Sequence, residues 1–181
     1  EQIVIGAVGR IDYAKDYDTL IKAFTSVLKQ SNNVILLIVG RIVQYDYYQS
    51  LTDLIKQNGL ESKIIFLPEM NSVNKFYQSI DIFVSSSYTE GFSNVIAEAM
   101  LASLPCVVTD AGDNVNLVGN AGIVVERRSH VALTEGILTM LENKDRREYY
   151  GVLAKKRIIA NYSLNTLIQN TEHYLKNLYE N

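Results

Sequence analysis

Short runs of apolar residues alternate along the chain with longer stretches in which apolar residues recur at helical spacing. The first two runs, Ile3–Val8 and Val34–Val39, have the length of β-strands. The second run consists of six consecutive apolar residues, which predicts a strand buried on both faces, as in a parallel sheet. Further strands are predicted at residues 63–67, 82–84, 106–109 and 122–125.

The stretches between these runs predict helices. After the first strand, Leu20, Phe24 and Val27 fall on one face of a helix, together with their neighbours Ile21 and Leu28. Helices are expected at residues 17–29, around 51–55, at 73–79, at 94–102, and from 129 to the end of the chain. Within this last stretch a boundary is predicted near residues 161–163, with Ser163 as an N-cap.

The alternation of strands and helices predicts an α/β fold. We expect a Rossmann-like, doubly wound parallel sheet with helices on both faces and a helical C-terminal tail. The length of 181 residues suits one domain with its own core, predicted to span residues 1–181. Because ligands of such sheets bind beyond the carboxyl ends of the strands, the loops that follow the strands are the candidate sites.

The composition narrows the function. Lys and Arg total 17 while Asp and Glu total 20, and this net charge of -3 argues against nucleic acid as a partner. Cys106 is expected in a buried strand, and the widely spaced His130 and His173 form no zinc pattern, so no metal is expected. No apolar stretch approaches the ~18 residues that span a bilayer and no signal peptide is visible, so a cytoplasmic location is expected.

The loop after the first strand, Val8–Lys15, combines a glycine with two cations. Gly9 permits a close approach to the backbone. Arg10 and Lys15 flank a predicted helix start, where free N–H groups already favour anions, so the loop is a candidate clamp for a diphosphate. The alternative is that both cations are solvated, and the dinucleotide-binding pattern G-x-G-x-x-G is absent.

A second loop precedes the helix predicted at 94–102 and carries Glu90. The backbone N–H groups of Gly91 to Asn94 can face a ligand there. Glu98 lies inside the apolar helix, where a carboxylate needs a partner, and the adjacent hydroxyls of a ribose would supply one. The alternative reads Glu90 as a helix N-terminal charge and Glu98 as an exposed helix residue.

Two further features carry weaker signals. The loop at residues 109–114 offers small and polar residues to the same crevice, although turn chemistry alone explains them. Basic clusters at residues 127–128, 146–147 and 155–157 are dispersed and interrupted by acids, which is typical of solvated helix faces.

The two main loops together resemble a known family. The motifs Val8-Gly9-Arg10-x-x-x-x-Lys15 and Glu90-Gly91-Phe92-(x)5-Glu98-Ala99-Met100 are similar to those of the family 4 retaining glycosyltransferases, which have the GT-B fold. The resemblance extends to Ser85-Ser86, to Pro105 and to Thr109-Asp110-x-Gly112, and it covers nearly the whole chain.

The resemblance implies a site for a nucleotide-diphosphate sugar. Arg10 and Lys15 would hold the diphosphate and stabilise the departing nucleotide without a metal or other cofactor. Glu98 would bind the ribose hydroxyls. Glu90 would contact the transferred sugar, as nucleophile or as electrostatic partner, and the residues that orient the sugar would be Gly91, Phe92, Ser93 and Asn94. Gly9 would complete the set of substrate-binding residues.

The sequence departs from the family pattern around these motifs. Asp16 stands where a glycine usually follows the lysine, which places an acid near the expected diphosphate site. Arg41 and Asp113 each follow a glycine where a second glycine is usual, and Ser103 also replaces a glycine. Asn116 stands at the position of a later acid. The two central motifs are intact.

GT-B enzymes have two Rossmann-like halves, and the resemblance assigns this chain to the C-terminal one. An N-terminal acceptor-binding domain of the same polypeptide and a glycan or lipid-linked acceptor are therefore expected partners, in the biosynthesis of cell-surface polysaccharide. The other half could hold the enzyme at the inner face of the membrane, and the donor half alone is expected to be nearly inactive. Alternatives are a GT-B sugar-nucleotide epimerase and a regulatory or scaffold module without turnover.

Overall fold

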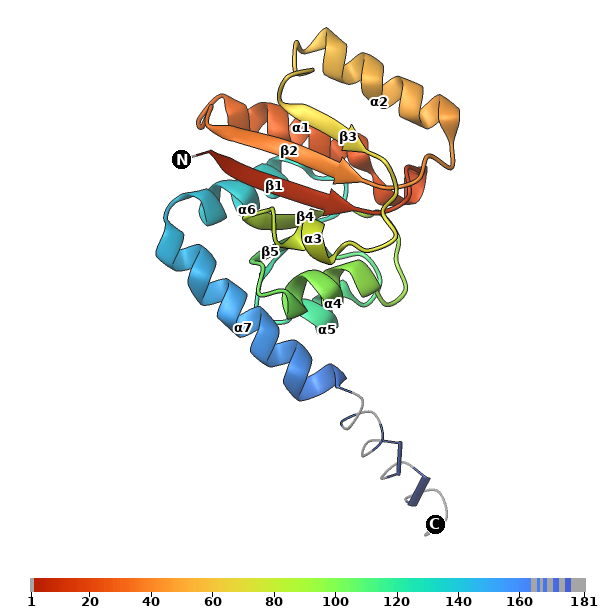
Figure 1. The fold of residues 1–181 in the computed structure, drawn as a ribbon, viewed down its shortest axis with the longest axis vertical. Helices are drawn as coiled ribbons and strands as arrows, with labels where there is room; N and C mark the ends of the chain where they lie inside the picture. The colour runs from red at the N-terminus through yellow and green to blue at the C-terminus, as the bar shows by residue number, and fades with distance from the viewer. Residues whose placement is uncertain (1, 164–165, 167, 169–170, 173–174, 177–181) are drawn as a thin grey trace.

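A six-stranded parallel sheet forms the centre of the computed structural model, which describes residues 2–163, 166, 168, 171–172 and 175–176 (Figure 1). The strand order is β3-β2-β1-β4-β5-β6, so the chain builds outward from β1 in one direction and, after crossing back, from β4 in the other. The strands are β1 (Ile3–Val8), β2 (Val34–Val39), β3 (Ile64–Leu67), β4 (Ile82–Ser85), β5 (Cys106–Thr109) and β6 (Ile123–Val125). The predicted doubly wound α/β fold is confirmed.

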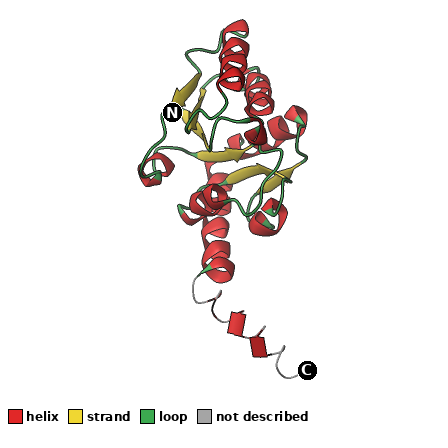
Figure 2. Ribbon diagram, turned by 90° about the vertical axis from the view of Figure 1, so that its right-hand side faces the viewer, coloured by secondary structure: helices red, strands yellow, loops and turns green. Residues whose placement is uncertain are grey.

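Helices cover both faces of the sheet (Figure 2). One face is covered by α1 (Tyr17–Leu28), α2 (Tyr45–Gln57) and α6 (His130–Leu141). The other face is covered by α3 (Asn74–Tyr77), α4 (Asn94–Leu101), α5 (Asn114–Val118) and α7 (Lys144–Tyr162). No helix among the described residues is long and apolar enough to span a bilayer.

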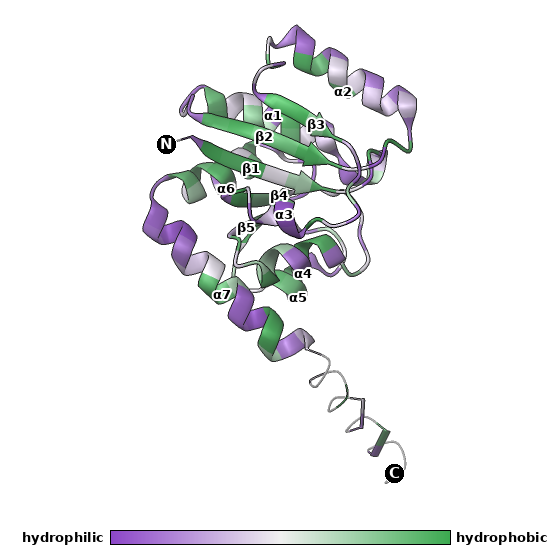
Figure 3. Ribbon diagram, in the orientation of Figure 1, coloured by the Kyte–Doolittle hydropathy of each residue, from purple (hydrophilic) through white to green (hydrophobic). Residues whose placement is uncertain are grey.

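The alternation of side chains along β2 divides the core into two layers. Leu36 and Ile38 are fully buried with the residues of α1, α2 and α6, whereas Val39 is buried on the opposite face with those of α3, α4 and α7. The strands are accordingly the most uniformly apolar part of the molecule, while α7 carries a polar surface (Figure 3). Burial of β2 on both faces, predicted from its unbroken apolar run, is found in part, since Ile35 and Leu37 on the second face are half-buried.

The helix boundaries differ from the predictions in two places. α5 was not predicted, because five residues are too few to show a helical period. A break at Glu142–Asn143 divides the predicted C-terminal helical stretch, and the Asn143 side chain accepts a hydrogen bond from the Arg146 N–H (2.7 Å) as the N-cap of α7. The predicted boundary near 161–163 is confirmed, since Ser163 Oγ accepts from the Thr166 N–H (3.2 Å). The rest of the predicted helical tail lies partly outside the described residues.

The loops that follow β1 and β2 cross in close contact. Ile11 pairs with Ile42 in a parallel bridge, and its N–H donates to the Arg41 carbonyl oxygen (2.8 Å). A β-carbon added to Gly40 would overlap the carbonyl oxygen of Gly9. Because backbone meets backbone there, only glycine fits at position 40, and this fit holds the loop after β1 against its neighbour.

We expect Gly40→Ala to lower the free energy of unfolding by about 1–3 kcal/mol, because neither backbone can retreat without disturbing the bridge beside it. Denaturant unfolding followed by circular dichroism measures the loss. Gly91→Ala is the matched control, since an added β-carbon there has no neighbour within 4 Å, and it should change stability by less than about 0.5 kcal/mol. Equal stability of the Gly40→Ala variant would contradict the close-packing argument.

Candidate active site

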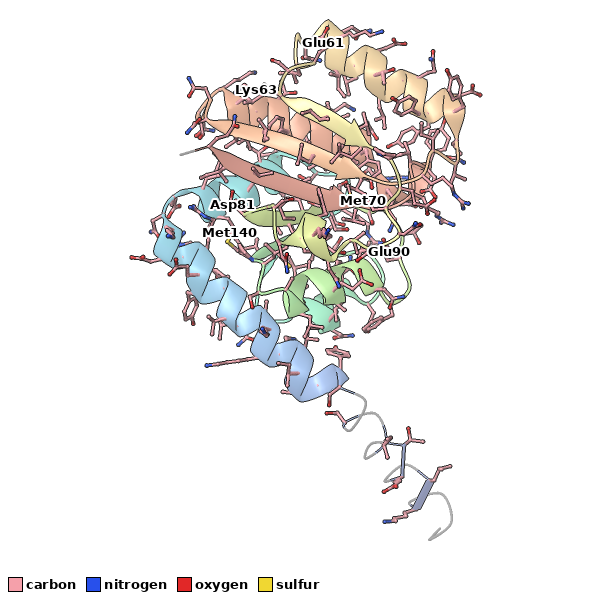
Figure 4. All side chains as sticks on the ribbon, in the orientation of Figure 1. Glu61, Lys63, Met70, Asp81, Glu90 and Met140 are labelled. Carbon is pink, nitrogen blue, oxygen red and sulfur yellow. The ribbon has the colours of Figure 1, made fainter. Side chains whose placement is uncertain are left out.

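The candidate site lies where the strand order reverses, between the carboxyl ends of β1 and β4. The loop after β1 carries Gly9, Arg10 and Lys15, and the loop after β4 carries Glu90. In Figure 4, Glu90 lies beyond the carboxyl ends of the strands, whereas Asp81 lies near their opposite ends. The two loops that the sequence singled out therefore face each other across the expected crevice.

An ion pair joins the two loops. Lys15 Nζ contacts Glu90 Oε1, and the two side chains are only 15% and 13% exposed. Ser87 Oγ also donates to Glu90 Oε1 (2.7 Å), so this oxygen accepts hydrogen bonds from both Lys15 and Ser87. The pair brings together two of the residues predicted to be catalytic and fixes the spacing between their loops.

The serine-rich segment before Glu90 attaches the loop after β4 to the loop after β1. Ser86 Oγ donates to the Lys15 carbonyl oxygen (2.8 Å), and the Tyr88 N–H donates to the Ala14 carbonyl oxygen (2.8 Å). Ser87 in turn accepts at its carbonyl from Thr109 Oγ1 (2.6 Å). These serines position the ion pair, a role that depends on contacts far apart in the sequence and that sequence reasoning missed.

The loop after β5 supports the Glu90 segment from behind. Gly112 has a φ of 55°, and a β-carbon there would overlap the Glu90 carbonyl oxygen. The Asp113 N–H donates to the Gly91 carbonyl oxygen (3.3 Å), and Asn114 Nδ2 donates to the Thr109 carbonyl oxygen (3.0 Å). The sequence predicted that this loop lines the crevice, and in the structure it braces the backbone at Glu90–Gly91.

Arg10 reaches into solvent at the edge of the crevice. Its side chain is 61% exposed, and its Nε lies 3.1 Å from Oδ2 of the buried Asp12. The other carboxylate oxygen of Asp12, Oδ1, is buried without a hydrogen-bond partner. Asp12 was not among the predicted site residues, since an acid in a polar loop carries no distinguishing sequence signal.

A cavity of about 290 Å³ opens between these groups and the start of α4. It is lined by Gly9, Arg10, Lys15, Glu90, Phe92, Ser93, Asn94 and Val95. The hydroxyl of Ser93, the N-cap residue of α4, is buried there without a hydrogen-bond partner. Free N–H groups at a helix start, one unpaired hydroxyl and two cations form an environment suited to an anion.

Glu98 lies one turn beyond this cavity and does not line it. Its side chain is exposed, and its Oε2 accepts a hydrogen bond from the Tyr77 hydroxyl (3.0 Å). Burial, and then the nearby Glu98 carboxylate, raises the pKa of Tyr77, so this hydroxyl stays a donor. The exposed position of Glu98 agrees with the alternative stated from the sequence, and binding of a ribose by Glu98 stays a prediction.

Asp16, the acid expected near the diphosphate site, lies outside this cavity. Its backbone is left-handed (φ 50°, ψ 45°), a conformation that a glycine adopts without strain. Its side chain is buried, its Oδ2 has no hydrogen-bond partner, and burial, aided by Asp18, raises its pKa to about 6.

Two smaller expectations concern metals and cysteine. Among the described residues, no group of three or more His, Cys, Asp and Glu side chains is placed to hold a metal ion. Cys106 is buried in β5 as predicted, and burial raises the pKa of its thiol, which keeps it protonated.

This chain belongs to the family of glycosyl transferases group 1, which it matches over residues 1–157. The resemblance seen in the two motifs is thereby confirmed. A Campylobacter jejuni N-acetylgalactosamine-N,N'-diacetylbacillosaminyl-diphospho-undecaprenol 4-alpha-N-acetylgalactosaminyltransferase is 33% identical over 157 residues, which are 85% of this chain and 41% of the relative. Capsular polysaccharide biosynthesis glycosyltransferase CapM of Staphylococcus aureus is 28% identical over 90% of this chain and 43% of its own length.

Solved structures share the fold. HepE of Anabaena, crystallised in complex with UDP, superposes with a TM-score of 0.89 at 24% identity, over 97% of this chain and 49% of its own. The C-terminal domain of the group 1 glycosyl transferase LpcC of Francisella tularensis superposes with a TM-score of 0.81 at 24% identity, over 90% of this chain and 87% of that domain. The chain spans less than half the length of the curated relatives that it matches, between 40% and 48%.

We expect Asp16→Asn to stabilise the protein near neutral pH. Folding raises the pKa of Asp16 from 3.8 to about 6, so the ionised carboxylate is less stable in the native state than in the unfolded chain. The free energy of unfolding therefore falls as the pH rises from about 4 to about 6. Asparagine tolerates the left-handed backbone and carries no charge. The gain in melting temperature should be full above about pH 6 and vanish below about pH 4. The same gain at every pH would contradict this account, and Asp46→Asn, an exposed acid of α2, is the control.

Proposed function

We propose that the chain is the donor-binding half of a retaining glycosyltransferase. The observation that carries this proposal is the largely buried Lys15–Glu90 pair at the mouth of a cavity that ends at the start of α4. Such a cavity offers positive groups to a diphosphate and a carboxylate to the sugar beside it. Membership of the family of glycosyl transferases group 1 supports the same reaction class.

In this proposal the diphosphate of the donor lies between the two cations and the first turn of α4. Arg10, at the exposed edge, and Lys15, at the buried wall, stabilise the negative charge that develops on the departing nucleotide. Arg10, Lys15 and the helix N–H groups would do what a metal ion does in other transferases, so no metal or other cofactor is proposed.

The sugar and the ribose occupy opposite ends of the diphosphate. Glu90 contacts the transferred sugar, and the backbone of residues 91–94 orients it. Glu98, exposed one turn further along α4, accepts hydrogen bonds from the ribose hydroxyls. An oxocarbenium-like transition state places positive charge on the sugar next to the Glu90 carboxylate, and the reaction retains the anomeric configuration.

Without donor, the site neutralises its own charges. Lys15 is paired with Glu90, and Arg10 with Asp12. An arriving diphosphate therefore competes with these carboxylates for the two cations, and a sugar hydroxyl takes the place of Lys15 at Glu90. This exchange gives both Lys15 and Glu90 a partner with and without donor, and low-dielectric surroundings would penalise an unpaired charge there strongly.

The rest of the enzyme is proposed from the coverage of the relatives. An N-terminal half of similar length would bind a glycan or lipid-linked acceptor and close the water-excluding cleft. One relative is named for capsular polysaccharide biosynthesis and another for a diphospho-undecaprenol substrate, and both names support a role in cell-surface polysaccharide. The enzyme would act on the cytoplasmic side, in contact with the membrane through the N-terminal half. Alone, the chain would transfer sugar very slowly.

Calorimetric titration of the chain with UDP, GDP and ADP tests the donor site. One nucleotide should bind saturably, and Arg10→Ala should weaken it about 10- to 100-fold, because a charge-assisted hydrogen bond to phosphate is lost. Arg127→Ala is the matched control, since Arg127 is also an exposed arginine beside an aspartate, Asp110 (3.4 Å), outside the proposed site. Absence of binding by all three nucleotides would count against the donor site.

The substitution Glu90→Gln distinguishes the role of Lys15 in binding the diphosphate from the role of Glu90 in transferring the sugar. The substitution leaves Lys15 without its internal counter-ion, so the nucleotide diphosphate should bind as tightly or up to about tenfold more tightly. Turnover by the full-length enzyme should fall at least about 100-fold. Glu148→Gln, in an exposed pair with Lys144 on α7, is the control for nucleotide affinity. Weaker nucleotide binding in Glu90→Gln would contradict the competition between Glu90 and phosphate for Lys15.

A further inference from the structure

A second cavity, of about 450 Å³, opens at the same edge of the sheet. Three segments line it. The first, between β1 and the first turn of α1, contributes Tyr13, Ala14, Asp16 and Asp18; the others are Tyr88–Thr89 after β4 and Arg128 between β6 and α6. None of the residues proposed to bind the donor lines it. Its volume exceeds that of the donor cavity, so a group of the size of a sugar ring has room there.

The two cavities share a wall. Ala14 lines the second cavity and Lys15 the donor cavity, and the backbone between them is held by Ser86 and Tyr88 through two hydrogen bonds of 2.8 Å. Only the backbone of residues 14–15 would therefore separate a ligand in the second cavity from Lys15, the cation that contacts Glu90.

Aromatic rings and a guanidinium form the outer part of the second cavity. Tyr13 and Tyr88 are 62% and 39% exposed, and the Arg128 guanidinium lies over the Tyr88 ring at 3.7 Å from its centroid. Arg128 has a φ of 60°, an unfavourable conformation for an arginine. Exposed rings and strained residues of this kind concentrate where proteins contact ligands.

Two carboxylates, those of Asp16 and Asp18, form the inner part of the second cavity. Asp16 lines the cavity, is nine-tenths buried, and has an oxygen, Oδ2, without a hydrogen-bond partner. Asp18, at the same wall, is paired with Lys22 (3.0 Å) and accepts from the Tyr47 hydroxyl (3.3 Å). Of these two acids, Asp16 is therefore the one with a buried carboxylate oxygen, Oδ2, that lacks a donor, and such an oxygen is unfavourable.

We infer that this second cavity binds one neutral sugar residue of the acceptor glycan, with its apolar face on the exposed Tyr13 ring and its hydroxyls donating to Asp16 and accepting from Arg128. The inference rests on the proposed glycosyltransferase function. Two carboxylates beside one arginine disfavour a phosphate or an acidic sugar. Two carboxylates are also too few for a metal cage, and no larger cluster exists among the described residues.

Amide chemical-shift mapping by NMR tests the inference on this chain. The probes are the methyl α-glycosides of glucose, mannose, N-acetylglucosamine and glucuronic acid. At least one neutral glycoside should shift the amides of Tyr13, Asp16, Thr89 and Arg128 saturably, and the glucuronide should bind more weakly than the neutral probe.

Two glycine variants remove the polar groups without straining the backbone. Asp16 and Arg128 both have positive φ, so Asp16→Gly and Arg128→Gly should fold and should each weaken glycoside binding about five- to tenfold. Ser103→Gly is the matched control, because Ser103 also has a positive φ (65°) and lies outside both cavities. It should leave the affinity unchanged.

Nucleotide titration of the same samples keeps the two proposals apart. Both variants should bind the nucleotide diphosphate like the unaltered chain. No glycoside shifts, shifts confined to the donor cavity, tighter binding of the glucuronide, or full affinity in both glycine variants would each overturn the sugar subsite. If the unaltered chain bound none of the three nucleotides, the proposed function itself would be overturned.

Discussion

The ion pair between Lys15 and Glu90 is the interaction around which the carboxyl edge of the sheet is organised. It joins the loops that follow β1 and β4, the two strands between which the chain changes direction and where a doubly wound sheet leaves a crevice. The neighbouring hydrogen bonds keep this pair in register. Ser86 holds the backbone of Lys15, Ser87 holds the carboxylate of Glu90, and Gly112 allows the loop after β5 to pack against the Glu90 backbone. The backbone of both loops is thus held in place before any ligand arrives, so Lys15 can exchange Glu90 for a phosphate without a rearrangement of the loops.

The same pair explains why the site is stable without ligand. Two opposite charges, mostly withdrawn from water, would each be unfavourable alone, and their mutual attraction offsets much of that penalty. Arg10 differs from Lys15 in its exposure to solvent, because its guanidinium is exposed while its partner Asp12 is buried. It can leave Asp12 and turn toward a ligand without itself being desolvated first. The site therefore combines one fixed cation at its wall with one movable cation at its edge.

Much of the fold followed from the sequence, because β1, β2 and β5 are buried apolar runs and their bounds coincide with the predicted ones. α5 escaped prediction because it is too short to show a period. In the site, Arg10, Lys15 and Glu90 were found through their motifs. Asp12 and Ser87 were not, and Gly112 was found in a motif but without its role. Their roles are a buried counter-ion, a hydroxyl donor and a missing β-carbon. These roles depend on contacts between residues that are distant in the chain, so no local sequence pattern predicts them.

Asp16 connects the departure from the family pattern with the second cavity. Its left-handed backbone accounts for a glycine at this position, so the aspartate must hold the same conformation with a side chain. That side chain points a buried carboxyl away from the donor cavity, into surroundings that already contain Asp18. An unsatisfied buried acceptor lowers stability, and the left-handed backbone costs an aspartate more than a glycine. A ligand hydroxyl that donates to the Asp16 carboxylate would offset the cost of leaving this carboxylate incompletely paired, which favours a binding role for Asp16 over a structural one.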